Sequence, residues 1–289
     1  MISSLGVTMR PYAGADEAAV LELINADRLV GQPEVSSAML AEALAGRSSV
    51  DSGWWEQLDL PDTYVAIDGD DSRIVGVISY AVRGKDQTGQ LLWLHCHEDS
   101  HLATTLIAHA CTALKPRPMH AFDFASALTR GLEGLPVGHR PATRSALEDA
   151  GFRGQDLWRY MHAPLPSPEA QRATRVKART EADAMRVLRI RRCLRTIAEA
   201  RIGEPVAGVG VLWWISVKTR ARRRGLGRKL LGSALHLLYK LGATEAILYV
   251  DDDAPPGDGR DRTAAKALYD SVGFTEVDRL YSYTRPPHA

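Results

Sequence analysis

Hydrophobic and polar positions follow two repeating patterns along the chain, and each pattern predicts one type of secondary structure. Short runs with period-two alternation predict strands, whereas apolar residues spaced three and four apart predict helices. In the first half the resulting order is a strand, two helices, three strands, a helix, a strand, a helix and a final strand. The segments concerned are 7–12, 16–29, 36–46, 63–68, 73–82, 90–98, 101–114, 120–126, 144–152 and 156–162.

The second half repeats this order in a shorter form. It has predicted strands at 174–180, 184–192, 195–203, 209–217, 245–251 and 279–285, and predicted helices at 225–242 and 263–274. The two early helices of the first half have no counterpart between the first strands of the second half. Self-similarity on this scale indicates that one domain plan occurs twice.

A proline-rich stretch separates the two halves. The sequence APLPSPEAQ at 163–171 contains three prolines and few large apolar residues, which is typical of a linker. We therefore expect one domain at 1–162 and a second at 172–289. A chain of 289 residues exceeds the usual size of a single domain and agrees with two.

Composition narrows the class of protein. Apolar residues make up 45% of the chain, charged residues 25%, and the formal net charge is +1, so we expect a globular protein that does not bind nucleic acid. No apolar run approaches the ~18 residues of a membrane span, and we expect no membrane contact. Residues 1–14 lack a basic region followed by an apolar one, which argues against a secretory signal. Three scattered cysteines indicate reduced thiols and a cytoplasmic location.

The strongest candidate for chemistry is the stretch RARRRGLGRKLL at 220–231, where a strand meets a helix. The first N–H groups of a helix have no partner within the helix and the helix dipole is positive there, so such an end binds phosphate. Gly225 and Gly227 allow the backbone to approach a pyrophosphate closely. Taken alone, the stretch also fits a glycine-containing turn with solvated arginines. The arginines around the glycines are Arg222, Arg223, Arg224 and Arg228.

Two motifs frame this junction. Residues 217–227 read Val-Lys-Thr-Arg-Ala-Arg-Arg-Arg-Gly-Leu-Gly, and the strand at 247–251 is followed by Ala-x-x-Leu-Tyr at 265–269 and then by Gly-Phe. In order and spacing they resemble the GNAT superfamily of N-acetyltransferases, whose main motif is Val-x-Pro-x-x-(Arg/Gln)-x-x-Gly-x-(Gly/Ala). Only the proline is replaced, by Thr219. The resemblance covers nearly all of the second half.

The resemblance implies an α/β (α+β) protein with two tandem GNAT-type domains, each a mixed, mostly antiparallel sheet flanked by helices. It also implies acetyl-coenzyme A as co-substrate, with the pyrophosphate on backbone N–H groups of 223–228. The pantetheine arm would pair with free backbone groups where the strands of this family splay. The expected cofactor-binding residues are Ile215, Val217, Arg222, Arg223, Arg224, Gly225, Leu226, Gly227 and Arg228.

Tyr269 matches the tyrosine that protonates the leaving thiolate in this family, although a packing role on a short helix also fits it. Many relatives carry a basic glutamate early in the strand that precedes the phosphate loop, but 209–217 contains no acid. Glu204, just upstream, is the candidate general base. Asp251 and Asp252 follow the next strand and are candidates for binding a cationic acceptor; each of these acids also fits a solvated turn.

The first half also resembles a GNAT fold, but its phosphate loop is degenerate. The corresponding loop has no glycine pair and no arginine, and Glu98 and Asp99 stand where a pyrophosphate would lie, so like charge disfavours binding. We expect this domain to bind no cofactor and to form one side of the acceptor pocket. Trp54 and Trp55 are candidate lining residues.

Two other clusters have simpler explanations than binding. His95, His97 and His101 lie near Cys96, but no Cys-x-x-Cys or His-x-x-x-His pair supports a metal site, and we expect no metal. Eight lysines and arginines between 175 and 195 fit a solvated sheet face. An anionic acceptor or a nucleic acid is the alternative, which the lack of interleaved aromatic residues weakens.

Together these features predict an acetyl-coenzyme A-dependent N-acetyltransferase that acts through its second half. The acceptor is expected to be a primary amine of a small molecule, an antibiotic or a peptide natural product. Two alternatives stay open: a non-enzymatic acyl-coenzyme A sensor or scaffold on the same fold, and an acetyltransferase for protein lysines or N-termini. The sequence leaves the acceptor, the acyl length and the oligomeric state undetermined.

Overall fold

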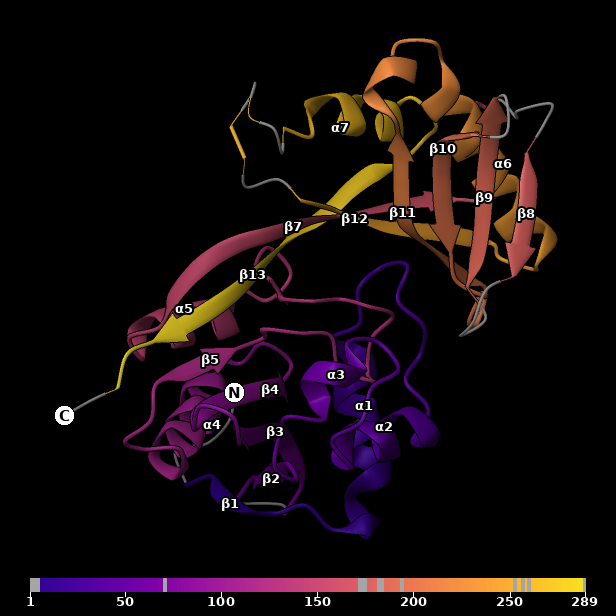
Figure 1. Cartoon of the computed structure of the whole chain (residues 1–289). Coiled ribbons are helices and arrows are strands. Elements are labelled where there is room, and N and C mark those ends of the chain that lie inside the picture. Colours follow the sequence, from indigo (N-terminus) through magenta and orange to yellow (C-terminus); the bar gives the residue numbers. More distant parts are fainter. Residues whose placement is uncertain are drawn as a thin grey trace. The chain divides into compact units, whose positions relative to one another are not determined.

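The chain forms two compact units in the computed structural model (Figure 1). Unit 1 contains Met1–Leu29, Glu34–Leu157 and Arg279–Ala289, and unit 2 contains Val30–Pro33 and Trp158–Asp278. The units are therefore not two consecutive halves. The structure describes residues 6–69, 72–170, 176–180, 185–192, 195–251, 254–255, 258 and 261–287.

Unit 1 is a sheet with helices on both faces. In sheet order its strands are β1 (Thr8–Pro11), β2 (Asp62–Ile67), β3 (Ile74–Arg83), β4 (Thr88–His95), β5 (Met119–Ala121) and the C-terminal part of β13 (Thr275–Arg285), which also pairs with β6 (Leu135–Pro136). Only β4 and β5 pair in parallel; the other described pairs are antiparallel. The helices are α1 (Glu17–Ala26), α2 (Ser37–Leu44), α3 (Ser52–Trp55), α4 (Ser100–Ala113) and α5 (Pro141–Asp149).

The hydrophobic core of unit 1 lies on both sides of this sheet because successive side chains of a strand point to opposite faces. On β3, Val77 packs in a cluster with Val20 of α1, whereas the next residue, Ile78, packs in a second cluster with Leu106 of α4. The period-two and helical patterns of the sequence thus match the two faces that are buried.

Within the described residues, unit 2 is a sheet of six strands and the first residues of β13, Thr275–Asp278, with helices packed on one face. In sheet order the strands are β7 (Arg153–Pro164), β12 (Glu245–Asp251), β11 (Val209–Val217), β10 (Arg195–Ile202), β9 (Arg186–Arg192) and β8 (Lys177–Thr180). β11 and β12 are parallel. The helices are α6 (Leu226–Lys240) and α7 (Thr263–Asp270). The apolar stripe of α6 joins Leu212 and Leu248 of the sheet in one buried cluster. No helix is described between β8 and β9, where 181–184 lie outside the described residues.

Two strands, β7 and β13, each run from one unit into the other. The second part of β7 pairs with β12 of unit 2, and Met161 is buried in the core of that unit. The last residues of β13 pair with β5 of unit 1, and Tyr283 is fully buried in the core of unit 1. Each half of the chain therefore contributes its last strand to the sheet of the other half.

The structure differs from the predicted elements in a few places. Ala163 pairs with Ala246 and is fully buried, and the Ser167 hydroxyl donates to the carbonyl of Val272 at 2.7 Å, so the described part of the expected linker is packed structure of unit 2. The strand expected at 120–126 is only β5, because a left-handed residue at Phe122 (φ 57°) ends it. The short helix α3 was not expected.

Candidate active site

The candidate site of unit 2 begins where β11 and β12 separate. The parallel pairs run from Val209–Glu245 to Leu212–Leu248 and stop there. β11 continues along β10 as far as the pair of Val217 with Ala198. The last residues of β11 therefore have a partner strand on one side only.

The backbone groups of Ile215 and Val217 point into this gap. The N–H of Lys218 donates to the carbonyl of Ile197 on β10 at 3.0 Å. Because backbone groups of successive residues point to alternate sides of a strand, those of Val217 and Ile215 point away from β10. The Val217 carbonyl accepts a hydrogen bond from Nε of Arg222 at 3.0 Å. The backbone groups of Ile215 and Val217, which the family resemblance assigns to the pantetheine arm, thus point away from β10.

The arginine-rich loop follows directly and leads into α6. Arg223 and Gly225 both have left-handed backbone conformations, with φ of 60° and 69°. Gly225 is the residue that caps α6, and no side chain among the described residues caps this helix start. Arg222, Arg223 and Arg224 are exposed, whereas Leu226 is half-buried. This is an uncapped helix N-terminus surrounded by guanidinium groups, an arrangement suited to an anion.

Helix α7 packs against the start of α6 and brings Tyr269 to the same region. A Cβ atom at Gly227 would lie 3.3 Å from Cδ2 of Leu268, and Nη2 of Arg228 donates to the Ser271 carbonyl at 3.3 Å. Tyr269 is 8% exposed, and its ring packs edge-on against Phe274. Burial raises the pKa of its hydroxyl to about 12, so the phenol stays protonated at neutral pH.

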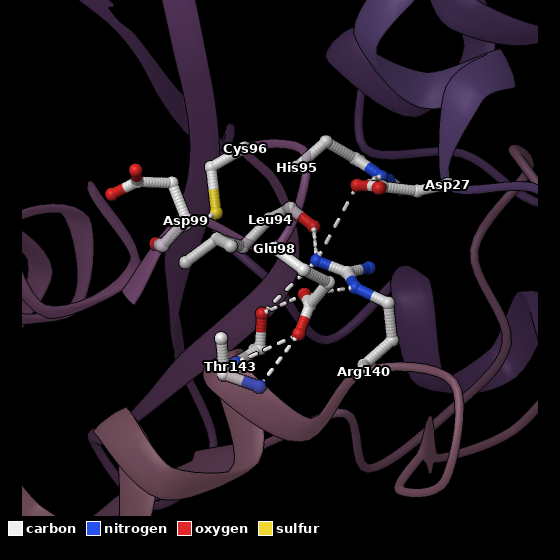
Figure 2. Close-up of polar contacts among 9 residues, drawn as sticks. Asp27, Leu94, His95, Cys96, Glu98, Asp99, Arg140 and Thr143 are labelled. Atoms are coloured by element: carbon white, nitrogen blue, oxygen red, sulfur yellow. Dashed lines mark hydrogen bonds and ion pairs between the residues drawn. The ribbon is translucent and has the colours of Figure 1, made fainter. Parts of the chain in front are cut away.

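The corresponding loop of unit 1 is filled by carboxylates of the chain itself (Figure 2). Asp99 caps α4 by accepting a hydrogen bond from the N–H of Leu102 at 2.9 Å. The Glu98 carboxylate accepts from the N–H groups of Ala142 and Thr143 at the start of α5, at 2.8 and 3.0 Å, and also binds Arg140. Both helix starts thus already hold a negative charge.

Arg140 ties this loop into a buried ionic network. The Arg140 side chain is 4% exposed, and its Nη2 donates to the Leu94 carbonyl at 2.9 Å. Nη2 also lies 3.5 Å from the Asp27 carboxylate. This carboxylate is in turn hydrogen-bonded to Nδ1 of His95 at 3.0 Å. Burial raises the pKa of Glu98, but the charge of Arg140 and its hydrogen bonds outweigh burial and hold it below its ordinary value. Burial lowers the pKa of His95 more than Asp27 raises it, so this imidazole is neutral.

The remaining candidates lie at different places. Glu204 accepts from Nε of Arg186 at 2.6 Å, in the turn between β10 and β11, at the opposite end of β11 from the arginine-rich loop. Asp251 ends β12 with its carboxylate 3.6 Å from Arg262. Asp252 lies outside the described residues. Within the described ranges, no group of three or more His, Cys, Asp or Glu side chains is placed to hold a metal ion.

The two tryptophans of α3 differ from each other in exposure. Trp55 is 2% exposed and donates to the Ala125 carbonyl at 2.9 Å, so it is a core residue of unit 1 rather than the lining residue that the sequence suggested. Trp54 is 48% exposed and stacks on Phe124. No helix among the described residues has the length and apolar character needed to cross a membrane.

Comparison with known proteins agrees with this geometry. Residues 197–274 match the acetyltransferase (GNAT) family. A mycothiol acetyltransferase of Renibacterium salmoninarum is 34% identical over 77 residues, which is 26% of this chain and 20% of that protein. A mycothiol acetyltransferase of Nocardioides sp. is 27% identical in an alignment of 224 residues that covers 56% of this chain and 73% of that protein.

Among solved structures, a tandem GNAT protein from the clavulanic acid biosynthesis pathway is similar in fold. It shares 14% sequence identity, the match covers 98% of this chain and 100% of that one, and the TM-score is 0.65. Residues 197–274 are thus similar to GNAT acetyltransferases, and the fold of the chain is similar to that of a tandem GNAT protein.

Proposed function

We propose that the protein is an acetyl-coenzyme A-dependent N-acetyltransferase whose unit 2 binds the co-substrate and whose unit 1 does not. One contrast carries this proposal. Within the described residues, no side chain caps the start of α6, and the exposed Arg222–Arg224 directly precede it, whereas the starts of α4 and α5 hold Asp99 and Glu98. A pyrophosphate would meet free N–H groups and positive charge in unit 2, and two carboxylates in unit 1.

The separated strands supply the path for the rest of the co-substrate. With the pyrophosphate at Gly225–Arg228, the pantetheine arm would run along β11 and bond to the backbone groups of Val217 and then Ile215. Such pairing adds a strand-like segment to an open edge, which gives affinity through main-chain hydrogen bonds. The acyl end would then lie near Trp213, where β11 and β12 part.

The reaction proposed is direct attack of an amine on the acetyl group. The nitrogen bonds to the carbonyl carbon, the carbon–sulfur bond breaks, and the sulfur leaves with the bonding electrons and takes a proton, while the amine gives one up to solvent or a base. Holding the two reactants together supplies much of the acceleration. Tyr269 is proposed to donate a hydrogen bond to the departing sulfur as negative charge develops there. The acceptor is proposed to be a primary amine of a small molecule or peptide natural product.

Calorimetric titration of the full chain with acetyl-coenzyme A tests the assignment to unit 2. We expect one site per chain, and at least about tenfold weaker binding in Gly225→Asp, because this substitution places a negative charge at the start of α6. Aspartate and asparagine are the non-glycine residues that best tolerate the left-handed conformation of Gly225, so the fold should persist.

The matched control is Gly225→Asn, which has the same shape without the charge and should keep most of the affinity. Equal affinity of Gly225→Asp and wild type would disprove the phosphate site. Two sites per chain would show that the loop of Glu98 and Asp99 also binds co-substrate.

A binding protein without turnover is the second candidate function. It is favoured by the absence of an acid in β11 and by the ion pair of Glu204 with Arg186, which engages the nearest upstream carboxylate. Release of free thiol from acetyl-coenzyme A in the presence of a primary amine distinguishes the two. Tight binding with no release over a broad panel of amines would support the sensor.

A further inference from the structure

A β-bulge in β11 places two adjacent tryptophans on one face of the unit 2 sheet. The register with β10 shifts between Arg201, opposite Trp214, and Ile202, opposite Leu212, so Trp213 is the inserted residue. Leu212 and Ile215, three residues apart, both pack in the cluster on the α6 side. The two residues between them therefore point to the face opposite α6.

Three aromatic side chains form a row across that face. Tyr249 on β12 and Tyr160 on β7 are cross-strand partners, and their rings stack with centroids 5.4 Å apart and an interplanar angle of 30°. Trp213 on β11 stacks on Tyr249 from the other side, at 6.5 Å and 23°. Tyr160 is fully buried, whereas Trp213 and Tyr249 are half-buried and keep accessible surface. We call Trp213, Tyr249 and Tyr160 the aromatic row.

The segment Val30–Pro33, which belongs to unit 2, holds the buried end of this row. Nε2 of Gln32 donates to the hydroxyls of Tyr160 at 3.0 Å and Tyr249 at 3.3 Å, and the Tyr160 hydroxyl donates to the Val30 carbonyl at 2.8 Å. Gly31 lies so close to the side chain of Ile247 on β12 that a Cβ atom added at Gly31 would be 2.7 Å from Cγ2 of Ile247. Gln32 is 5% exposed and hydrogen-bonds to both tyrosine hydroxyls, so it fixes the orientation of the two rings.

The charged groups nearby are already paired. On the same face, Glu199 lies opposite Ser216 and binds Arg189 at 2.8 Å and Arg201 at 3.0 Å. On β12, Glu245 and Asp251 share the face of Tyr249; Glu245 pairs with His162 at 2.6 Å and Asp251 lies 3.6 Å from Arg262. A second cationic group on the acceptor would therefore compete with these existing partners, whereas a flat uncharged ring would be accepted.

From this arrangement we infer that the aromatic row is the acceptor subsite and that it selects primary amines carrying an aromatic ring a few bonds from the nitrogen. The inference rests on the proposed function, because the row lies where β11 and β12 part, next to the proposed position of the acyl group. Trp213, at the end of the row, stacks on the acceptor ring; Tyr249 supports Trp213 by stacking on it, and Gln32 is a positioning residue that holds the tyrosine rings. The reacting nitrogen then follows the acetyl transfer written above, with no further reactant.

Two amines of the same size test the inference with the full chain. We expect kcat/KM for 2-phenylethylamine to exceed that for 2-cyclohexylethylamine by about three- to tenfold, the factor that ring stacking contributes. Trp213→Leu and Tyr249→Leu should bring this ratio close to one. Tyr249→Phe, which keeps the ring, should preserve the ratio, and so should Tyr239→Leu, which removes a 45% exposed tyrosine from α6.

Gln32→Leu should raise KM for 2-phenylethylamine more than it lowers kcat, and leave the affinity for acetyl-coenzyme A unchanged. A merely structural role would instead raise KM, lower kcat and weaken acetyl-coenzyme A binding together. Equal use of both amines by the wild type, or a preference that survives Trp213→Leu, would overturn the inference while leaving acetyl transfer intact.

Direct binding separates the failure of the inference from the failure of the proposed function. Each amine is titrated by calorimetry into the protein saturated with coenzyme A. No thiol release with any amine, together with a binding preference for the aromatic amine that Trp213→Leu removes, would uphold the subsite and disprove the acetyltransferase. Thiol release without any binding preference would disprove the subsite alone.

Discussion

Burial sets the chemistry available to Tyr269. Its hydroxyl has a pKa of about 12, above the ~8.5 of an ordinary thiol, so complete proton transfer to a thiolate is uphill. A hydrogen bond to the departing sulfur is therefore the favoured contribution, and it strengthens as negative charge develops there. The same shift keeps the donor protonated over the whole range in which enzymes are normally assayed.

Replacing Tyr269 by phenylalanine should lower kcat on the order of 10²-fold, the loss typical of removing one donor to a developing charge. The affinity for acetyl-coenzyme A should stay within about twofold, because the ring and its packing on Phe274 are kept. Single-turnover kinetics and calorimetry measure the two quantities. Equal losses in rate and affinity would assign Tyr269 to binding.

In the wild type, kcat should not fall between pH 7 and 10 on account of this hydroxyl.

His95 makes the stability of unit 1 depend on pH. Its pKa is lowered in the folded state by burial, so the unfolded chain binds a proton that the folded chain does not. This contribution is present above the ordinary pKa of ~6.5 and is lost as the pH falls below it. The free energy of unfolding should decrease from pH 7.5 to 5.5, measured with urea. His95→Gln should reduce the slope, whereas substitution of the exposed His101 should leave it unchanged. A slope unaffected in His95→Gln would contradict this assignment.

At the scale of elements, the helix starts of the two units differ in what satisfies their N–H groups. Asp99 and Glu98 stabilise α4 and α5 from within the chain, whereas α6 begins at a glycine. An intramolecular cap stabilises a helix at all times but closes the helix end to an anion. Unit 1 therefore gains stability from a cap at the position where, in unit 2, we propose that the co-substrate binds.

Removal of the α4 cap should destabilise unit 1 without affecting the site of unit 2. Asp99→Ala is expected to cost about 1 kcal/mol and to lower the melting temperature by about 2–4 °C, because the N–H of Leu102 loses its acceptor. Asp99→Asn keeps a capping side chain and should melt close to the wild type. Thermal melts followed by circular dichroism check both variants, and calorimetry checks that acetyl-coenzyme A binding is unchanged. Weaker co-substrate binding in Asp99→Ala would contradict the separation of roles.

The sequence was sufficient to predict the helices and strands whose apolar side chains face a core. The apolar stripe of α6 and the run of β11 predicted both elements and the loop that joins them. Trp213 and Tyr249 were missed because their alignment depends on a bulge and on a neighbouring strand. Gln32 was missed because the contact joins residues more than a hundred positions apart. Alternation along β11, in which Leu212 and Ile215 cannot share one face without a bulge, was the one available signal.

At the scale of the whole molecule, the exchange of β7 and β13 makes the two units depend on each other's chain segments. Tyr283 is buried in the core of unit 1, although it follows every residue of unit 2 in sequence. Met161 and Ala163 are buried in the core of unit 2, although they follow the elements of unit 1. The order of elements predicted two copies of one plan but not which copy completes which sheet, because strand partners are decided by non-local contacts.

A truncation tests this dependence. Deleting Arg279–Ala289 should unfold or strongly destabilise unit 1, because it removes the strand that pairs with β5 and leaves a fully buried tyrosine site empty. Hydrogen exchange should show lost protection in β4 and β5. Deleting only 286–289, beyond β13, should leave protection unchanged. Normal protection of β5 in the longer truncation would show that unit 1 folds without this strand.

The position of β13 also bears on how the protein is made. A ribosome synthesises this strand after the other strands and helices of both units, at about 5–20 residues per second. The sheet of unit 1 therefore lacks the strand that pairs with β5 until unit 2 has been translated. We therefore expect unit 1 to reach its final form only after unit 2 has been translated, and a message cut short within unit 2 to yield a unit 1 sheet that lacks this strand.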